Sequence, residues 1–312
     1  MRKIYIYSAI GVAILLAITA LAVYLHTANI PVLEPAGPIA IQERAVIVIT
    51  LLLCAIVVVP VFVLLFLFAW KYRSTNAKAD ARYSPEGDHA NLTIEFTWWL
   101  VPAVIIAVLS VIMWQSSHAL DPYKPLPGNS MVVEVVALDW KWLFIYPAQG
   151  IASLNLLEIP KDVPVTFKLT ADAPMNSFWI PQLGGQIMVM PGMVTDLNLM
   201  ASKLGTFDGF SANISGQGFA GMAFKVNSVS LDDFNAWVQS ARESSSTPLT
   251  LAAYNTLAEP SEYNAVARYA PVDDNLYADI VMKYMMASTT TPVPSSMQMS
   301  GMSGMDMTNT MP

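Results

Sequence analysis

Cysteine and histidine are almost missing from this sequence of 312 residues. Cys54 is the single cysteine, and the last of the three histidines is His118. A lone cysteine excludes an intrachain disulfide, and its place inside an apolar run indicates a packing role. Soft copper centres are held by thiolate and imidazole donors. From Ala119 to Pro312 the chain has neither donor, so a centre of that kind is excluded there.

Charged residues are scarce as well. They make up 12% of the chain, against 54% hydrophobic residues, and the mean hydropathy is +0.47. This composition is too apolar for a soluble protein and predicts a membrane protein that carries an aqueous domain. The formal net charge of −7 argues against nucleic acid as a partner, because phosphate binding needs clustered lysine and arginine. An excess of acid beyond Leu231 indicates a solvated acidic face.

Residues 1–28 have the pattern of a signal peptide or an N-terminal anchor. Two basic residues precede an apolar run from Ile4 to Leu25, which is the order found in both kinds of segment. Small residues around Ala22 and at Ala28 offer cleavage sites, whereas the length of the run also suits an uncleaved helix. We favour cleavage. In either case residues 29–44 are expected outside the cytoplasm, which in a bacterium means the periplasm.

Two further apolar runs, 45–70 and 95–117, are each long enough to cross about 30 Å of hydrocarbon. Tryptophans at both ends of the second run are typical of membrane interfaces. The segment between the runs, 71–94, holds an excess of basic residues, which favours the cytoplasmic side. These residues are Lys71, Arg73, Lys78 and Arg82. The same rule places the chain from residue 118 onward in the periplasm.

Between residues 118 and 229 the pattern changes to short β-rich runs separated by proline and glycine. Val165, Phe167 and Leu169 alternate with Thr166 and Lys168, as in a half-buried strand. The expected strands are Met131–Leu138, Trp140–Tyr146, Pro164–Thr170, Val194–Met200 and Met222–Val229. Their lengths and spacing predict an antiparallel sandwich or barrel.

Residues 230–287 predict a small helical arm. Ser230 is placed to cap a helix with two aspartates in its first turn, where the helix dipole favours them. Further helices are expected at Leu249–Leu257, Glu262–Tyr269 and Asn275–Met286. Residues 288–312 are too poor in bulky apolar groups to order themselves. The six methionines of this tail suit Cu(I), which is soft, but we favour a low-complexity terminus without such a role.

The order of two membrane helices, a β-domain and a helical arm is combined with six notable segments. These are Glu43–Arg44, Phe68–Arg73, His118–Leu120, Asp139–Trp142, Met175–Phe178 and Pro260–Asn264. From about Pro35 to Met286 the chain resembles subunit II of the haem–copper respiratory oxidases, and it is most similar to their quinol oxidase branch of the cytochrome bo type. The resemblance implies an α+β membrane protein: a two-helix transmembrane hairpin, then a periplasmic cupredoxin-like β-sandwich and a small C-terminal helical arm.

In relatives that oxidise cytochrome c, this domain holds two coppers bridged by two cysteines. The resemblance places the histidine ligands on Asn176 and Phe219, the cysteines on Ser211 and Ser215, the carbonyl ligand on Asn213 and the methionine on Met222. Only the thioether is kept. A serine hydroxyl stays protonated near neutral pH and cannot replace a bridging thiolate, and a phenyl ring has no donor. We therefore expect residues 118–229 to lack the dicopper site and to use these positions for packing.

Two further sites follow from the resemblance. Trp140 and Trp142 stand where relatives have an aromatic patch that receives electrons from cytochrome c, a role that has no acceptor without copper. Strand alternation would put both indoles on one face, so we expect a contact with the catalytic subunit or a place in the core.

Glu95 precedes Trp99 by four residues and Pro102 by seven, as in the family's Glu-x-x-x-Trp-x-x-Pro pattern. The resemblance implies a carboxylate at the mouth of a proton channel in subunit I. The alternative is a hydrated helix end, because ionisable residues at a membrane boundary also occur without a function.

These features predict a non-redox subunit II of a proton-pumping terminal quinol oxidase in the inner membrane of a bacterium. The complex would oxidise ubiquinol and reduce O₂ to water, and this chain would have no catalytic centre of its own. The resemblance places the haems, the catalytic copper and the quinol site in subunit I, alongside further small membrane subunits. Quinol arrives through the membrane lipid, so cytochrome c is not expected as a partner and this chain needs no cofactor.

Two alternatives compete with this interpretation. A cytochrome c oxidase subunit II would need the missing ligands. A membrane-anchored periplasmic copper-binding protein would use its methionines and would have no haem-bearing partner. One departure from the quinol oxidase branch is also plain: relatives often carry a lipidated cysteine near the position of Ala28, and none is present there.

Overall fold

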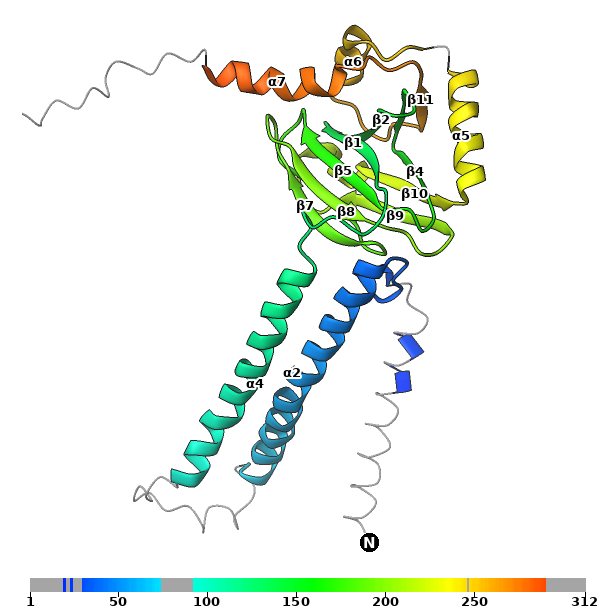
Figure 1. The fold of residues 1–312 in the computed structure, drawn as a ribbon. Helices are drawn as coiled ribbons and strands as arrows, with labels where there is room; N and C mark the ends of the chain where they lie inside the picture. The colour runs from blue at the N-terminus through cyan, green and yellow to red at the C-terminus, as the bar shows by residue number, and fades with distance from the viewer. Residues whose placement is uncertain (1–18, 21–22, 25–29, 74–91, 246, 290–312) are drawn as a thin grey trace, which may run out of the picture.

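The computed structural model describes residues 19–20, 23–24, 30–73, 92–245 and 247–289. Two long helices, α2 (Pro38–Lys71) and α4 (Leu92–Ala119), stand beneath a β-sandwich (Figure 1). A short 3₁₀ helix, η1 (Pro31–Leu33), precedes α2. The predicted signal or anchor lies almost wholly outside the described residues. So do residues 74–91 of the predicted cytoplasmic loop and the tail from residue 290.

Both long helices are apolar enough to cross a membrane. The predicted spans 45–70 and 95–117 lie within α2 and α4. Helix α2 begins at Pro38, earlier than the predicted span, because Gly37 caps it in an extended conformation and Pro38 occupies its first position. The extra turns lie outside the apolar run that predicted the span.

The first turns of α2 are fixed to the sandwich. Ala40 is buried, and the Glu43 carboxylate accepts a hydrogen bond from the Gly185 N–H at 3.0 Å. Gly37 is required by close approach, because a Cβ there would lie 2.3 Å from the Met200 carbonyl oxygen. Packing against the sandwich therefore extends the helix beyond the expected membrane span.

The segments beside both helices are also tied to the sandwich. The backbone N–H and the side-chain amide of Asn198 both donate to the Pro122 carbonyl, at 3.1 and 3.0 Å, just beyond α4. Lys203 Nζ donates to the Pro35 carbonyl at 2.9 Å, just before α2. The membrane hairpin and the aqueous domain are therefore joined at two places.

The strands form two facing sheets. Sheet A has the order β11-β3-β2-β1-β5-β8 and sheet B the order β4-β10-β9-β6-β7. Sheet A consists of β1 (Met131–Leu138), β2 (Lys141–Tyr146), β3 (Ile151–Leu154), β5 (Val165–Ala171), β8 (Thr195–Leu199) and β11 (Ala267–Tyr269). Sheet B consists of β4 (Leu156–Pro160), β6 (Asn176–Ile180), β7 (Gly184–Val189), β9 (Gly205–Ser211) and β10 (Ala223–Val229).

The sheets are mixed. β1 pairs with β5, and β10 with β4, in parallel. The prediction of a purely antiparallel arrangement is wrong for these two pairs. After β3 the chain crosses to sheet B for β4 and returns as β5 beside β1, and a crossover of this kind allows parallel pairing where a tight hairpin does not.

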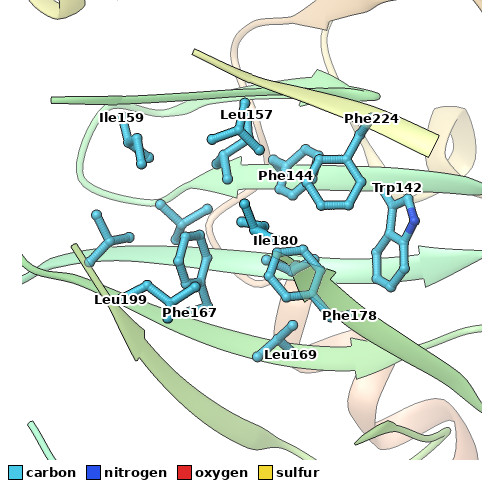
Figure 2. Close-up of a cluster of buried hydrophobic side chains, with 14 of the residues drawn as sticks. Trp142, Phe144, Leu157, Ile159, Phe167, Leu169, Phe178, Ile180, Leu199 and Phe224 are labelled. Atoms are coloured by element: carbon cyan, nitrogen blue, oxygen red, sulfur yellow. The ribbon is translucent and has the colours of Figure 1, made fainter. Parts of the chain in front are cut away.

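Aromatic side chains fill the space between the sheets (Figure 2). Trp142 and Phe144 of β2 face Phe178 of β6 and Phe224 of β10. The rings of Phe178 and Phe224 stack with centroids 5.2 Å apart, and Trp142 meets Phe178 edge-on at 5.3 Å. Gly209 leaves room for this cluster, because a Cβ there would lie 2.2 Å from the Phe224 ring. Such close packing makes the interior sensitive to added volume.

The chain after β10 covers sheet A. Helix α5 (Leu231–Ser244) packs at the edge of the core, and Ser230 Oγ accepts from the Asp233 N–H at 3.1 Å, so the predicted cap is confirmed. Helices α6 (Leu251–Leu257) and α7 (Leu276–Thr289) bury a second apolar cluster on the outer face of the sheet. Helix α7 lies across the end of the sandwich that faces away from α2 and α4 (Figure 1).

One predicted helix of the arm is wrong. Residues 262–269 form no helix, and Ala267–Tyr269 is instead strand β11, paired antiparallel with β3. The backbone N–H and C=O groups of these residues pair with β3 at the edge of the sheet instead of forming the hydrogen bonds of a helix. The fold class is nevertheless confirmed: two apolar helices, then a cupredoxin-like sandwich and a C-terminal arm that is mainly helical.

Candidate functional site

The six positions that would hold a dicopper centre gather at one end of sheet B. Asn176 begins β6, Ser211 ends β9, and Met222 directly precedes β10. β9 pairs antiparallel with both β6 and β10, so these three residues meet at the same end. The loop between β9 and β10 supplies Asn213, Ser215 and Phe219.

Ser211 is the centre of a buried hydrogen-bond cluster. Its Oγ accepts from the Ser177 N–H at 3.3 Å. The same Oγ lies 3.0 Å from Asn176 Oδ1 and 3.2 Å from the Asn213 carbonyl, and its single proton can serve either acceptor. The Asn213 side chain donates to the Met175 carbonyl at 2.7 Å. Asn176 and Ser211 are only 1% and 4% exposed, so these polar groups are satisfied within the protein.

The other half of the site is packed around Met222. This residue is 1% exposed, and the Ser215 hydroxyl donates to its sulfur over 3.9 Å. Phe219 lies half-buried in a short 3₁₀ helix, η2 (Gln217–Gly221). Hydroxyl, amide, thioether and phenyl groups thus line the place where two thiolates and two imidazoles would be needed.

This donor set does not fit a dicopper centre. Serine oxygens are hard donors that keep their protons near neutral pH, and one thioether cannot bridge a pair of soft ions. Within the described parts of the chain, no group of three or more His, Cys, Asp or Glu side chains is arranged to hold a metal ion. No redox step is assigned to these residues.

The two tryptophans occupy different environments. Trp142 is completely buried in the core between the sheets and offers no indole surface to another protein. Trp140 precedes β2, in a turn with φ of 63°, and its indole N–H donates to the Ser215 carbonyl at 3.3 Å. Trp140 is half-buried and packs against the same core cluster that contains Trp142, as the expected shared strand face requires. Only Trp140 remains a candidate for a subunit contact.

The arm closes over the loop between β9 and β10. A Cβ at Gly218 would lie 2.5 Å from the Trp140 indole and 2.7 Å from Glu262 Cγ. One at Gly221 would lie 2.9 Å from the ring of Tyr263. Glycines are thus required at both places by the close approach of the segment that joins α6 to β11.

Lys141 is hydrogen-bonded to the same segment between α6 and β11. This side chain is 2% exposed, and its ammonium group donates to the Glu259 carbonyl at 2.7 Å and to the Ser261 hydroxyl. Burial lowers the pKa of Lys141, while Asp139 and Glu259 act in the opposite direction. Asn155 links the segment to β2, because it accepts from the Trp142 N–H at 2.9 Å and donates to the Asn264 carbonyl at 3.0 Å.

Asp172 fastens the helices of the arm. Its carboxylate, 7% exposed as a residue, accepts from the Tyr254 hydroxyl of α6 at 2.8 Å. It also accepts from Lys283 Nζ of α7 at 2.8 Å and from the Tyr284 hydroxyl. Burial raises the pKa of both tyrosines, and the neighbouring Asp172 charge raises it further. One buried carboxylate, directly after β5, therefore holds both α6 and α7.

Glu95 lies in the first turn of α4 and is exposed. Trp99 and Pro102 follow on the same helix, and the spacing of four and seven residues keeps all three on one side of it. This end of α4 is the one that points away from the sandwich (Figure 1). The structure thus does not bring Glu95 together with the old ligand positions.

Comparison with known proteins gives two matches along the chain. Residues 113–229 match the family "Cytochrome C oxidase subunit II, periplasmic domain", and residues 244–288 match the "COX Aromatic Rich Motif". The cytochrome bo(3) ubiquinol oxidase subunit 2 of Pseudomonas aeruginosa is 45% identical over 265 residues, which is 84% of this chain and 79% of the relative. The ubiquinol oxidase subunit 2 of Acetobacter aceti is 45% identical over 293 residues, 92% of this chain and 94% of the relative.

The chain belongs to the ubiquinol oxidase subunit 2 family. This confirms the predicted haem–copper oxidase subunit II of the quinol oxidase branch. As a ubiquinol oxidase subunit 2 homologue, the chain is part of an oxidoreductase complex and is anchored by its two apolar helices. A subunit II implies partner subunits in that complex.

Sequence reasoning about this ubiquinol oxidase subunit missed the residues that hold the arm. Lys141 is a polar residue within a predicted strand, and Asn155 and Asp172 lie beside β-rich runs; a surface position explains such a pattern equally well. The arm segment Pro260–Asn264 was notable in the sequence, but its contact with the old copper loop was not predicted. Only the fold brings these residues together, since their partners lie about a hundred positions away or more.

Proposed function

We propose that this chain is the non-redox subunit II of a proton-pumping terminal quinol oxidase of the aerobic respiratory chain. The complex oxidises ubiquinol and reduces O₂ to water. This chain supports subunit I structurally and at the point where protons enter. The family assignment supports the complex, and the chemistry of the old ligand positions supports the word non-redox.

The observation that carries the proposal is the state of Ser211 and Ser215. Both hydroxyls are engaged by protein groups, the first by Asn176 and the Ser177 N–H, the second by Met222. No electron relay is built from such donors. Electrons must then reach the oxygen-reducing site without this domain, which is possible if the donor is quinol dissolved in the lipid. The haems, the catalytic copper and the quinol site belong, in this proposal, to subunit I.

The surface of the membrane hairpin supports a partner in the membrane. Side chains of α2 and α4 are exposed and apolar around most of the helix surface, including Phe66, Trp99 and Met113 at 68%, 76% and 69%. Lipid and the helices of subunit I and smaller subunits would cover them. Trp140 is a second contact candidate, on the periplasmic side. The compartment is the bacterial inner membrane, with residues 71–94 cytoplasmic and the sandwich periplasmic.

Glu95 is proposed as a proton-gathering carboxylate at the cytoplasmic mouth of a channel in subunit I. Its support is its exposed position at the end of α4 that points away from the sandwich. An ionisable group at a membrane boundary can exchange protons with water while the following apolar turns seal the helix in the lipid.

Affinity purification of the tagged full chain from its native membranes tests this proposal. Haem-bearing membrane subunits should copurify, and the preparation should consume O₂ with ubiquinol as the electron donor and not with reduced cytochrome c. Turnover with cytochrome c would favour a cytochrome c oxidase subunit instead. Recovery of the chain alone, free of haem, would favour a free-standing copper-binding protein.

A further inference from the structure

Methionines are concentrated at one end of the sandwich. Four of the 18 methionines lie between residues 175 and 193. Met175 precedes β6, Met188 lies in β7, and Met190 and Met193 flank the turn that follows β7. Met175, Met188 and Met193 are 42%, 41% and 50% exposed. Exposed methionine contributes little to the core, so their concentration at one place calls for another explanation.

Strand pairing places three of these residues together. Asn176 pairs with Val189 and Ser177 with Met188. Met175 and Met190, one residue further along each strand, are therefore opposite each other, next to the Asn176–Val189 pair. Directly opposite residues in an antiparallel ladder have Cβ atoms about 4.5–5.5 Å apart, and diagonal neighbours about 7–8 Å. The backbone of Met175 is also fixed, because its carbonyl accepts from the Asn213 side chain at 2.7 Å.

A tight turn brings in the fourth methionine. The Met193 N–H donates to the Met190 carbonyl at 3.4 Å, across Pro191 and a Gly192 with φ of 71°. Proline and then a glycine with positive φ at the two central positions define a type II turn, whose ends lie within about 7 Å. Met190 and Met193 are thus held side by side at the two ends of this turn.

Helix α7 supplies a fifth thioether from the arm. Gly192 lies directly against it, since a Cβ there would lie 3.1 Å from Tyr284 Cβ and 3.8 Å from the Met285 nitrogen. Met285 is 49% exposed. Asp172 holds this part of α7 in place through Lys283 and Tyr284. Two separate parts of the chain therefore bring the backbones of methionine residues close together at the surface.

We propose that the methionine cluster, Met175, Met188, Met190, Met193 and Met285, binds Cu(I). Thioethers are soft ligands that select Cu(I) over harder cations. Methionine is unbranched, and its three rotatable side-chain bonds allow sulfur atoms from fixed backbone positions to converge on one ion. The cluster shares no residue with the old dicopper positions, and its chemistry needs neither thiolate nor imidazole. It goes beyond the quinol oxidase role and does not depend on it.

Titration of the full chain in detergent with Ag(I), a redox-inert soft ion, tests the proposal by equilibrium dialysis. Three variants are compared with the wild type. The first carries Met175→Leu, Met188→Leu, Met190→Leu and Met193→Leu. The second carries leucine at all six tail methionines, which separates the cluster from the tail. The third is a matched control with leucine at three methionines outside both groups, Met113→Leu, Met131→Leu and Met200→Leu. Leucine nearly conserves volume, and thermal unfolding checks that each variant folds.

The cluster variant should lose one equivalent of tightly bound Ag(I), whereas the tail variant and the control should keep it. Met285→Leu alone should weaken this equivalent severalfold, and Zn(II) should not compete for it. A cluster variant that binds as much Ag(I) as the wild type would overturn the proposal. So would a tail variant that binds none, because all binding would then reside in the tail.

Discussion

At Ser211 and Ser215, the positions that the resemblance assigns to bridging cysteines, the side chain ends in oxygen instead of sulfur. An oxygen donor differs in chemistry from a sulfur donor, and the structure uses both hydroxyls as hydrogen-bond partners. Function at the scale of single residues then moves elsewhere in the chain. Two side chains are the subject of predictions at this scale: Glu95, proposed as a proton-gathering carboxylate, and Asp172, which holds the arm.

Glu95→Ala should slow ubiquinol-driven turnover and proton uptake severalfold without loss of assembly, because the exposed end of α4 would lose its only carboxylate near the membrane surface in the described part of the chain. The measurement is O₂ consumption and pH change in vesicles that hold the purified complex. Glu95→Asp is the matched control and should restore much of the rate. Unchanged turnover and pumping in Glu95→Ala would leave Glu95 as a hydrated helix end.

The buried tyrosines predict an alkaline limit to stability. Burial and the Asp172 charge raise the pKa of Tyr254, so the folded protein keeps a proton that the unfolded chain loses near pH 10. The contribution is fully present below about pH 10 and is lost as the pH rises, by up to about 1.4 kcal/mol per pH unit for each such group.

Tyr254→Phe should make this alkaline decline shallower. At neutral pH the same variant should lose about 1.5–3 kcal/mol, because the hydrogen bond to the charged Asp172 carboxylate is removed. Urea unfolding of the detergent-solubilised chain at pH 7 to 11, followed by tryptophan fluorescence, measures both effects. An identical slope in the variant and the wild type above pH 10 would count against the buried hydroxyl as the cause.

At the scale of elements, the main feature is the arm, which covers two parts of the sandwich. α6 and α7 cover the outer face of sheet A with a second apolar cluster, and the segment before β11 closes over the loop between β9 and β10. Polar side chains from the sandwich tie down each part, Lys141 the segment and Asp172 the helices. The arm therefore covers the loop between β9 and β10 and is hydrogen-bonded to the sandwich at two places.

Asp172→Ala should loosen α6 and α7. The change leaves the Tyr254 and Tyr284 hydroxyls without their acceptor, which costs about 1–3 kcal/mol for a buried donor. Limited proteolysis of the full chain should then cleave the arm faster than in the wild type. The control is Asp279→Ala, which removes an exposed carboxylate of α7 and should behave as the wild type. Equal protection of the arm in both variants would contradict the anchoring role of Asp172.

Elements with strong local patterns could be predicted from the sequence. The predicted strands at Met131–Leu138 and near Val165–Leu169 are present, and so is the Ser230 cap. β6 and β9 were missed because Asn176 and Gly209 interrupt the β pattern, and both are explained only by partners across the sheet or the core. The helix expected at 262–269 failed for the same reason, since β11 exists through its pairing with the distant β3.

The candidate site was predicted in part. The old copper positions were assigned by the resemblance, and in the structure these residues lie together at one end of sheet B. What the sequence did not reveal is which neighbours satisfy them. Trp142 lies in the core, one of the two places expected for it, and Trp140 packs half-buried against the same cluster.

At the scale of the whole molecule, the chain is a membrane hairpin joined firmly to an aqueous domain. Gly37 and Glu43 fix α2 to the sandwich, and Asn198 fixes the segment after α4. The two helices are therefore held at fixed places against the sandwich. We propose copper binding only as Cu(I) at the methionine cluster, which includes none of the old ligand positions.

Electron paramagnetic resonance of the purified full chain, loaded with copper and partially oxidised, tests the central claim most directly. Cu(I) held by thioethers has no unpaired electron and gives no signal, and a mixed-valence copper pair is distinguished from a single Cu(II) ion by hyperfine coupling to two copper nuclei. We predict no coupled dicopper signal, because oxygen and phenyl groups occupy the positions of thiolate and imidazole. A coupled dicopper signal at one centre per chain would contradict the account.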